Sequence, residues 1–176
     1  MTADPLQRFS DGVVRLRPLD VADAEAQVAG EDDAMVRWLS GGRSTVEHQR
    51  VYLASAARAW ADRHDVFDLG IALVDDDTLV GMVGIQSGMA YLAVGQVNIT
   101  YGLYPPWRGR GLATRAVRLA IDLALELFRP TELVIRVDRA NTASAAVPDR
   151  LGFTFSHHTT AEDDGEGELD WYVLKG

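Results

Sequence analysis

Two hydrophobic periods along the chain predict which segments are strands and which are helices. In residues 95–105 apolar side chains alternate with other residues, at Val97, Ile99, Tyr101 and Leu103, which is typical of a strand. Short apolar runs bounded by turn residues indicate further strands. We expect them at 13–19, 66–74, 78–86, 132–138, 153–158 and 168–176.

A period of three to four residues marks the segment from Leu112 to Phe128. Its polar positions, apart from Thr114, share one helical face, and the other positions are apolar, so the helix should pack deeply on a sheet. The same reasoning predicts helices at 21–30, 32–40, 46–63 and 141–153. Strands that alternate with helices predict a single domain over residues 1–176, α/β or α+β in class, with a mixed sheet.

Composition narrows the function classes. The 176 residues carry a net charge of −9, which disfavours nucleic acid and anionic membranes as partners. The chain has no cysteine, so disulfides, thiolate metal ligands and a cysteine nucleophile are excluded, and we expect no metal. The start, MTADPLQRFS, lacks the pattern of a signal peptide, and no apolar run is long enough to span a membrane. We therefore expect a cytoplasmic protein.

The start of the long helix is unusually basic for an acidic chain. Arg108, Arg110 and Arg115 surround Gly109 and Gly111, although a helix N-terminus already carries partial positive charge. Glycine lets the backbone bend so that successive N–H groups point outward, and those groups have no partner within the helix. These features predict a phosphate-binding site. The alternative is an ordinary helix start with surface arginines.

Two well-known phosphate motifs do not fit this segment. A P-loop requires a lysine after its second glycine, and this segment has none. A dinucleotide-binding turn requires a third glycine or an alanine where Thr114 stands, and it belongs to the first strand–helix unit of a domain. NAD binding is therefore only a weak alternative.

The stretch RGRGLA at 108–113 resembles the acetyl-CoA pyrophosphate motif of the GNAT superfamily of N-acetyltransferases. It follows a strand with NITYGLYP, as the fourth strand of that family does. Further on, NTASAAVPDRLGF resembles the family's next helix and strand, and VRLRPL with Trp38 resembles its RimJ/RimL branch. The resemblance extends from about residue 13 to 175. It implies a mixed, mostly antiparallel central sheet with two splayed parallel strands, flanked by helices.

The resemblance also implies acetyl-CoA as the cosubstrate. Its pantetheine arm would lie between the splayed strands, where exposed backbone groups can pair with its amides. Asn141 would contact this arm and is also a good helix N-cap, while Arg115 either reaches a phosphate or is a solvated surface residue. The residues expected to bind acetyl-CoA are Tyr101, Gly102, Leu103, Arg108, Gly109, Arg110, Gly111, Leu112, Ala113, Thr114 and Asn141.

Three positions bear on catalysis. Asn98 stands where many relatives carry a glutamate as general base, and an amide cannot accept that proton. Pro148 stands where many carry a tyrosine that protonates the departing thiolate. Ser144 matches a serine of the RimJ/RimL branch and is the expected catalytic residue, a hydrogen-bond donor to the thiol. Because a proline within a helix crowds the carbonyl group four residues earlier, we expect a kink or a break at Pro148.

Weaker signals mark the acceptor side. We expect Trp38, Arg43 and Asn98 to contact the acceptor, although packing is the stronger explanation for Trp38. The segment 159–169 is strongly acidic and would attract a cationic amine. The alternative is a solvated acidic loop.

The sequence does not identify the general base. Asp138, His157 and His158 are candidates because they lie near strand ends, and each is also explained as a structural residue. The expected reaction is direct attack of a primary amine, from a protein N-terminus or a small molecule, on the thioester in a ternary complex. The alternative is a CoA-binding regulatory module with little or no turnover. We expect a monomer or a homodimer.

Overall fold

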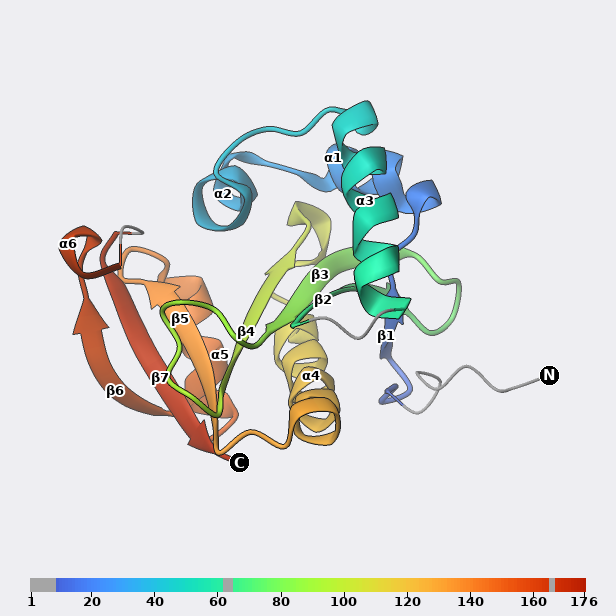
Figure 1. Ribbon diagram of the computed structural model, residues 1–176. Helices are drawn as coiled ribbons and strands as arrows, with labels where there is room; N and C mark the ends of the chain where they lie inside the picture. Colours follow the sequence, from blue (N-terminus) through green and yellow to red (C-terminus); the bar gives the residue numbers. More distant parts are fainter. Residues whose placement is uncertain (1–8, 62–64, 165–166) are drawn as a thin grey trace.

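The computed structural model describes residues 9–61, 65–164 and 167–176, and its centre is one twisted sheet (Figure 1). The strand order is β1-β2-β3-β4-β5-β7-β6, and every neighbouring pair is antiparallel except β4 and β5. The strands are β1 (Val14–Pro18), β2 (Val66–Leu73), β3 (Leu79–Gln86), β4 (Gln96–Leu103), β5 (Glu132–Asp138), β6 (Thr154–Thr159) and β7 (Leu169–Lys175). The predicted fold class is confirmed, and each predicted strand lies within two residues of its expected ends.

Helices cover both faces of this sheet (Figure 1). α1 and α3 pack on one face against β3 and β2, and α4 packs on the opposite face against β1, β3 and β4. The end of the predicted helix at 46–63, residues 62 and 63, lies outside the described residues. The helical segments are η1 (Val21–Asp23), α1 (Ala24–Gly30), α2 (Asp33–Met35), η2 (Val36–Ser40), α3 (Val46–Ala61), η3 (Pro105–Trp107), α4 (Leu112–Phe128), α5 (Thr142–Arg150) and α6 (Ala161–Asp164).

The main core lies between the sheet and α4, as the apolar face of that helix predicts. Val83, Ile99 and Ile135 from three strands pack with Val117 and Ala120 of α4, and all five are buried. A smaller apolar cluster lies on the other face of the sheet. That face therefore keeps more of its surface for polar side chains.

An ion pair fixes the corner between β1 and α1. Asp20 caps η1 by accepting the N–H of Ala22 at 2.6 Å, and the Asp20 N–H donates to Asp23 at 2.9 Å. Arg17 donates to both carboxylate oxygens of Asp23, at 2.8 and 2.7 Å. This corner sets the direction in which the chain leaves β1 and enters η1 and α1.

No helix within the described residues is both long enough and apolar enough to cross a membrane.

Candidate active site

β4 and β5 separate after a short parallel contact (Figure 1). Among the described residues they pair over Gln96–Asn98 and Glu132–Val134, and beyond these residues β4 continues along β3 while β5 continues along β7. Strand edges that diverge leave backbone N–H and C=O groups facing the gap without a neighbouring strand. This is the splayed parallel pair that the resemblance implies.

A cavity of about 1300 Å³ opens where the two strands separate. That volume exceeds the several hundred Å³ that are usual for a single small ligand. Arg110, Gly111, Leu112 and Thr114 are not among the residues that line it. The predicted site residues that do line it are Trp38, Arg43, Asn98, Tyr101, Gly102, Leu103, Arg108, Gly109, Ala113, Asn141 and Ser144.

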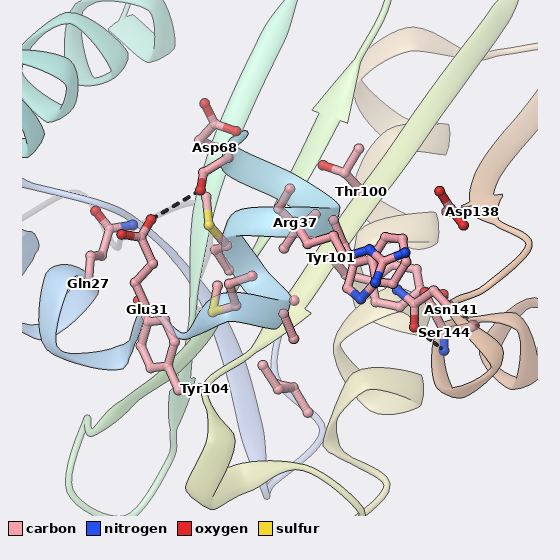
Figure 2. Close-up of a pocket in the computed structure, with 18 of the residues that line it drawn as sticks. Gln27, Glu31, Arg37, Asp68, Thr100, Tyr101, Tyr104, Asp138, Asn141 and Ser144 are labelled. Carbon is pink, nitrogen blue, oxygen red and sulfur yellow. Dashed lines mark hydrogen bonds between the residues drawn. The ribbon is translucent and has the colours of Figure 1, made fainter. Parts of the chain in front are cut away.

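Ser144 and Tyr101 form a hydrogen-bonded pair in this cavity (Figure 2). The Ser144 hydroxyl donates to Tyr101 Oη at 2.9 Å, and the Tyr101 hydroxyl donates to the backbone oxygen of Ser144 at 2.8 Å. Asn141 is the N-cap of α5, as predicted, and accepts the Ser144 N–H at 3.2 Å. Burial raises the pKa of Tyr101 to about 12, so its phenol stays protonated at neutral pH.

The helix that carries Ser144 runs without a break through Pro148, so the predicted break is wrong. Proline has no N–H, so the carbonyl group of Ser144, four residues earlier, cannot receive its usual helical hydrogen bond. The Tyr101 hydroxyl supplies that missing bond. The proline therefore explains why β4 and α5 are joined at this point.

Glycines in the left-handed conformation shape the start of α4. Gly109 has φ 72° and Gly111 has φ 75°. A Cβ atom at either position would have no neighbouring heavy atom within 4 Å, so backbone conformation, rather than crowding, favours glycine here. Gly111 is the N-cap and provides no capping side chain. The N–H groups of the first turn are therefore available to an anion.

Two of the arginines near this turn already have acidic partners. Arg108 donates to both carboxylate oxygens of Asp32, at 2.7 and 2.8 Å, and Arg115 pairs with Asp11 at 2.7 Å. Hydrogen bonds from the Arg108 guanidinium hold the pKa of Asp32 at about 2. Arg110 is exposed and lies over the indole ring of η3, 5.0 Å from the ring centre.

Asn98 lines the cavity and is only 1% exposed. Its Nδ2 donates to Gln86 Oε1 at 3.0 Å and to Tyr91 Oη at 3.3 Å. Its Oδ1 is buried and has no hydrogen-bond partner among the described residues. An unpaired buried oxygen atom is costly, so a donor from a ligand would be stabilised here.

The other two predicted acceptor contacts, Trp38 and Arg43, come from the segment around η2. The guanidinium of Arg37 lies over the Trp38 ring, 4.2 Å from its centre. Arg43 forms an ion pair with Asp33. Both predicted residues line the cavity, but both are also engaged by neighbours within the chain.

The candidate bases are only partly at the cavity. Asp138 lines it and accepts the N–H of Ala140 at 2.8 Å. His157 stacks on a tryptophan of β7 with ring centres 4.9 Å apart, and His158 bonds to an aspartate of β7 at 3.1 Å. Neither histidine is a lining residue. Of the acidic segment 159–169, Glu166 lies outside the described residues.

Sequence reasoning missed Asp68, which lines the cavity from β2. Its carboxylate accepts a hydrogen bond from the Tyr52 hydroxyl of α3. Burial raises the pKa of Asp68, and the hydrogen bond from Tyr52 only partly offsets that effect. The one available signal was an aspartate between Phe67 and Leu69 in a run that is otherwise largely apolar.

Comparison with known proteins identifies the family. The family model for an acetyltransferase (GNAT) domain matches residues 14–154. The chain belongs to the GNAT acetyltransferases. A probable N-acetyltransferase of Bacillus subtilis (strain 168), YjcK, is 27% identical to this GNAT protein over 148 residues, which is 80% of each chain.

Solved structures of GNAT proteins share the fold. RimJ of Mycobacterium smegmatis, in complex with CoA-disulfide, has a TM-score of 0.79 at 22% identity and covers 94% of this chain and 83% of its own. RimL, a ribosomal L7/L12 alpha-N-protein acetyltransferase in complex with coenzyme A, has a TM-score of 0.77 at 17% identity. The match covers 95% of this chain and 96% of the RimL chain. The predicted family is confirmed, and the protein is an acyltransferase.

Proposed function

We propose that this GNAT protein is an acetyl-CoA-dependent N-acetyltransferase that moves the acetyl group from the thioester to a primary amine by direct attack in a ternary complex. One observation carries the proposal. A single cavity contains the opening between β4 and β5, the Ser144–Tyr101 pair, and a polar acceptor face beneath α1 and α3. Thioester, thiol-side donor and amine would meet there, which is the proximity that such a reaction needs.

The residues present fit acetyl-CoA. The amides from Arg110 to Thr114 would receive the pyrophosphate, because the first turn of α4 has no side-chain cap. The gap-facing backbone of Tyr101–Leu103 would pair with the pantetheine amides, since β5 has left β4 at that point. Asn141 would contact the same arm from the start of α5.

In the proposed reaction the amine nitrogen attacks the thioester carbonyl carbon. A C–N bond forms, the C–S bond breaks, and its electron pair passes to the sulfur atom. The Ser144 hydroxyl donates a proton to that sulfur, and the serine regains a proton, through water, from the nitrogen as the amide forms. The neutral phenol of Tyr101 positions the serine through two hydrogen bonds.

Calorimetric titration with acetyl-CoA tests the donor side without knowledge of the acceptor. We expect micromolar affinity for the wild type and a loss of about 100-fold or more in Gly111→Asp and Arg110→Glu. Both variants place a negative charge beside the expected pyrophosphate, and Gly111→Asp also strains a left-handed backbone. Wild-type affinity in both variants, or NAD binding in place of acetyl-CoA, would contradict the proposal.

Thiol release then tests turnover, with no protein cysteine to give a background. We expect acetyl-CoA with butylamine, or with a short peptide that has a free N-terminus, to yield CoA and an acetylated amine in equal amounts by mass spectrometry. The amide Asn98 at the usual base position favours the alternative, a CoA-binding module without turnover. Tight binding without product from either acceptor would support that alternative.

A further inference from the structure

Asp68 and Thr100 face one another across a glycine on the acceptor face of the sheet. In the strand register Asp68 of β2 lies opposite Gly84 of β3, and Gly84 lies opposite Thr100 of β4. A Cβ atom at Gly84 would stand 2.5 Å from Thr100 Oγ1 and 3.1 Å from Asp68 Oδ1. The two oxygen atoms therefore lie no more than 5.6 Å apart, the sum of these distances. A side chain at Gly84 would collide with Thr100 Oγ1, so the glycine is what lets the two oxygen atoms approach one another above β3.

One nitrogen atom can bridge two oxygens within that limit. An N–H···O hydrogen bond spans about 2.9 Å between heavy atoms, and two donors of a tetrahedral nitrogen diverge by about 109°, so one nitrogen bridges two oxygens that are about 4.7 Å apart. An alkylammonium group carries three such donors. Asp68 and Thr100 both line the cavity that also contains Tyr101 and Ser144 (Figure 2).

The position of Thr100 suits attack on a thioester held between β4 and β5. Thr100 lies two residues beyond the last β4–β5 pair, at Asn98, and therefore beside the opening of the gap. Neighbouring side chains in a strand point to opposite faces, so Thr100 and Tyr101 flank that opening from the two sides. An amine at Thr100 and the hydroxyl of Ser144 would approach the thioester from opposite directions.

No cation pairs with Asp68 among the residues that the structure describes. Within the same residues its carboxylate accepts a hydrogen bond from the uncharged hydroxyl of Tyr52. The cavity's nearby arginines are engaged elsewhere: Arg43 and Arg108 pair with other aspartates, and Arg37 lies over a tryptophan ring. A carboxylate withdrawn from water without a cation is costly, and a cationic ligand would remove that cost.

A second, independent observation that indicates a ligand with N–H donors comes from Asn98, on the same face of β4. Asn98 lies two residues before Thr100, so its side chain points to the same side about 7 Å away along the strand. It is almost fully buried, and its Oδ1 has no donor among the described residues. The cavity thus offers a third oxygen atom to a ligand rich in N–H groups.

We infer that Asp68 and Thr100 bind the acceptor as an alkylammonium ion and that Asp68 takes the proton which this ion must lose before attack. The inference rests on the proposed function and deepens it, since it names the acceptor as a cationic alkylamine. Asp68 would thus act as the general base, a role that the amide of Asn98 cannot fill.

All protons of the reaction are accounted for. One ammonium proton moves to the Asp68 carboxylate, and the freed lone pair forms the C–N bond while the C–S bond breaks. The sulfur takes the Ser144 proton, and the serine regains one, through water, from the nitrogen as the amide forms. Asp68 then releases its proton to solvent, so an ammonium ion and acetyl-CoA give an amide, CoA and one proton.

Kinetics with two small amines test this assignment. Butylamine is a cation at neutral pH, because an alkylammonium has a pKa of about 10.4 like that of lysine, whereas hydroxylamine is uncharged there. In Asp68→Asn we expect kcat/KM for butylamine to fall by about 100-fold, the usual contribution of a general base. With hydroxylamine, after subtraction of the uncatalysed rate, we expect a change of no more than about threefold, because it needs neither a counter-ion nor deprotonation.

Matched variants separate this role from a structural one. Asp68→Glu keeps the carboxylate and should recover part of the butylamine activity, and Asp122→Asn, at an exposed position on α4, should leave both rates unchanged. Gly84→Ala should lower activity with both amines, because its methyl group would stand 2.5 Å from Thr100 Oγ1 and displace that side chain. Calorimetry should show wild-type acetyl-CoA affinity in all four variants.

The outcomes distinguish the two claims. Equal losses for both amines in Asp68→Asn, or no loss for either, would overturn the role of Asp68 while leaving the acetyltransferase proposal intact. Full activity of Gly84→Ala would overturn the placement of the amine. Absence of thiol release by the wild type with both amines would overturn the proposed function and this inference with it.

Discussion

The donor side and the acceptor side of the cavity are built in different ways. On the donor side the first turn of α4 takes its form from consecutive residues, with Gly109 and Gly111 in left-handed conformations. On the acceptor side Asp68, Gly84 and Thr100 come from three strands that are separated along the chain and adjacent only in the sheet. A local motif can therefore reveal the first site, whereas only the strand register reveals the second.

The charges of the two sides also differ. Arg108 and Arg115 near the donor site are neutralised by Asp32 and Asp11. Backbone N–H groups are thus the main attraction for a phosphate there, with Arg110 beside them. The acceptor side instead has a carboxylate whose described partner is an uncharged hydroxyl. In the proposed arrangement, the donor site would rely on backbone geometry and the acceptor site on charge.

Ser144→Ala should have the largest effect on turnover, because Ser144 acts on the thiol whichever amine is the acceptor. We expect kcat to fall by about 100-fold, as for loss of one preorganised donor, with equal losses for butylamine and hydroxylamine. That equality separates Ser144 from Asp68. Tyr101→Phe, which removes only the hydrogen bonds that position the serine, should cost about 10-fold. Steady-state thiol release measures both, and an unchanged kcat in Ser144→Ala would contradict its role.

Asp23→Asn should lower the stability of the fold without changing the donor site. Asp23 is 8% exposed and holds Arg17 by two hydrogen bonds, so we expect unfolding in urea to cost about 2 kcal/mol less. Asp77→Asn removes the exposed partner of the same arginine and should cost less than about 1 kcal/mol. Acetyl-CoA affinity should stay the same in both. Equal stability losses would show that burial of the pair does not matter.

The same ion pair predicts how stability depends on pH. Burial alone would raise the pKa of Asp23, but hydrogen bonds from Arg17 and from the Asp20 N–H outweigh it and lower the pKa. Its stabilisation is therefore complete above the unfolded value of about 3.9 and is lost as the pH falls through the lower folded value. Denaturation curves of the wild type and Asp23→Asn should converge in that acidic range. A constant difference at all pH values would contradict this assignment.

Asp32→Asn should produce the smallest effect, an increase in acetyl-CoA affinity of about threefold. The substitution keeps the side-chain oxygen that accepts the Met35 N–H at 3.0 Å, but it releases Arg108 from a charged partner. Calorimetry measures the change, and Asp33→Asn, which releases only Arg43, is the control. A fall in affinity would mean that the ion pair with Asp32 positions Arg108 for binding.

The sequence was sufficient for the architecture and for the local backbone at the start of α4. Alternation in β4 and the single polar face of α4 are local patterns, and the glycines at 109 and 111 mark a backbone conformation that few other residues adopt. The N-cap role of Asn141 followed from its side chain and position. These features depend on neighbours in sequence, so they could be predicted without knowledge of the packing.

Pro148 and Asp68 show why the rest could not be predicted. A kink or break was expected because a proline in a helix disturbs the carbonyl group of Ser144, four residues earlier. The helix continues, and the hydroxyl of Tyr101 from β4 donates a hydrogen bond to that carbonyl group. Asp68 gains its importance from Tyr52 and from Thr100, which approaches it across Gly84, and only the folded arrangement brings these residues together. Partners that are distant in sequence decided both cases.

A crystal structure of the protein with acetyl-CoA would test the central claim most directly. The account predicts the pantetheine arm between β4 and β5, the pyrophosphate on the amides from Arg110 to Thr114, and the thioester sulfur within hydrogen-bonding distance of the Ser144 hydroxyl. A cofactor bound elsewhere, or a sulfur atom that points away from Ser144 and Thr100, would contradict it.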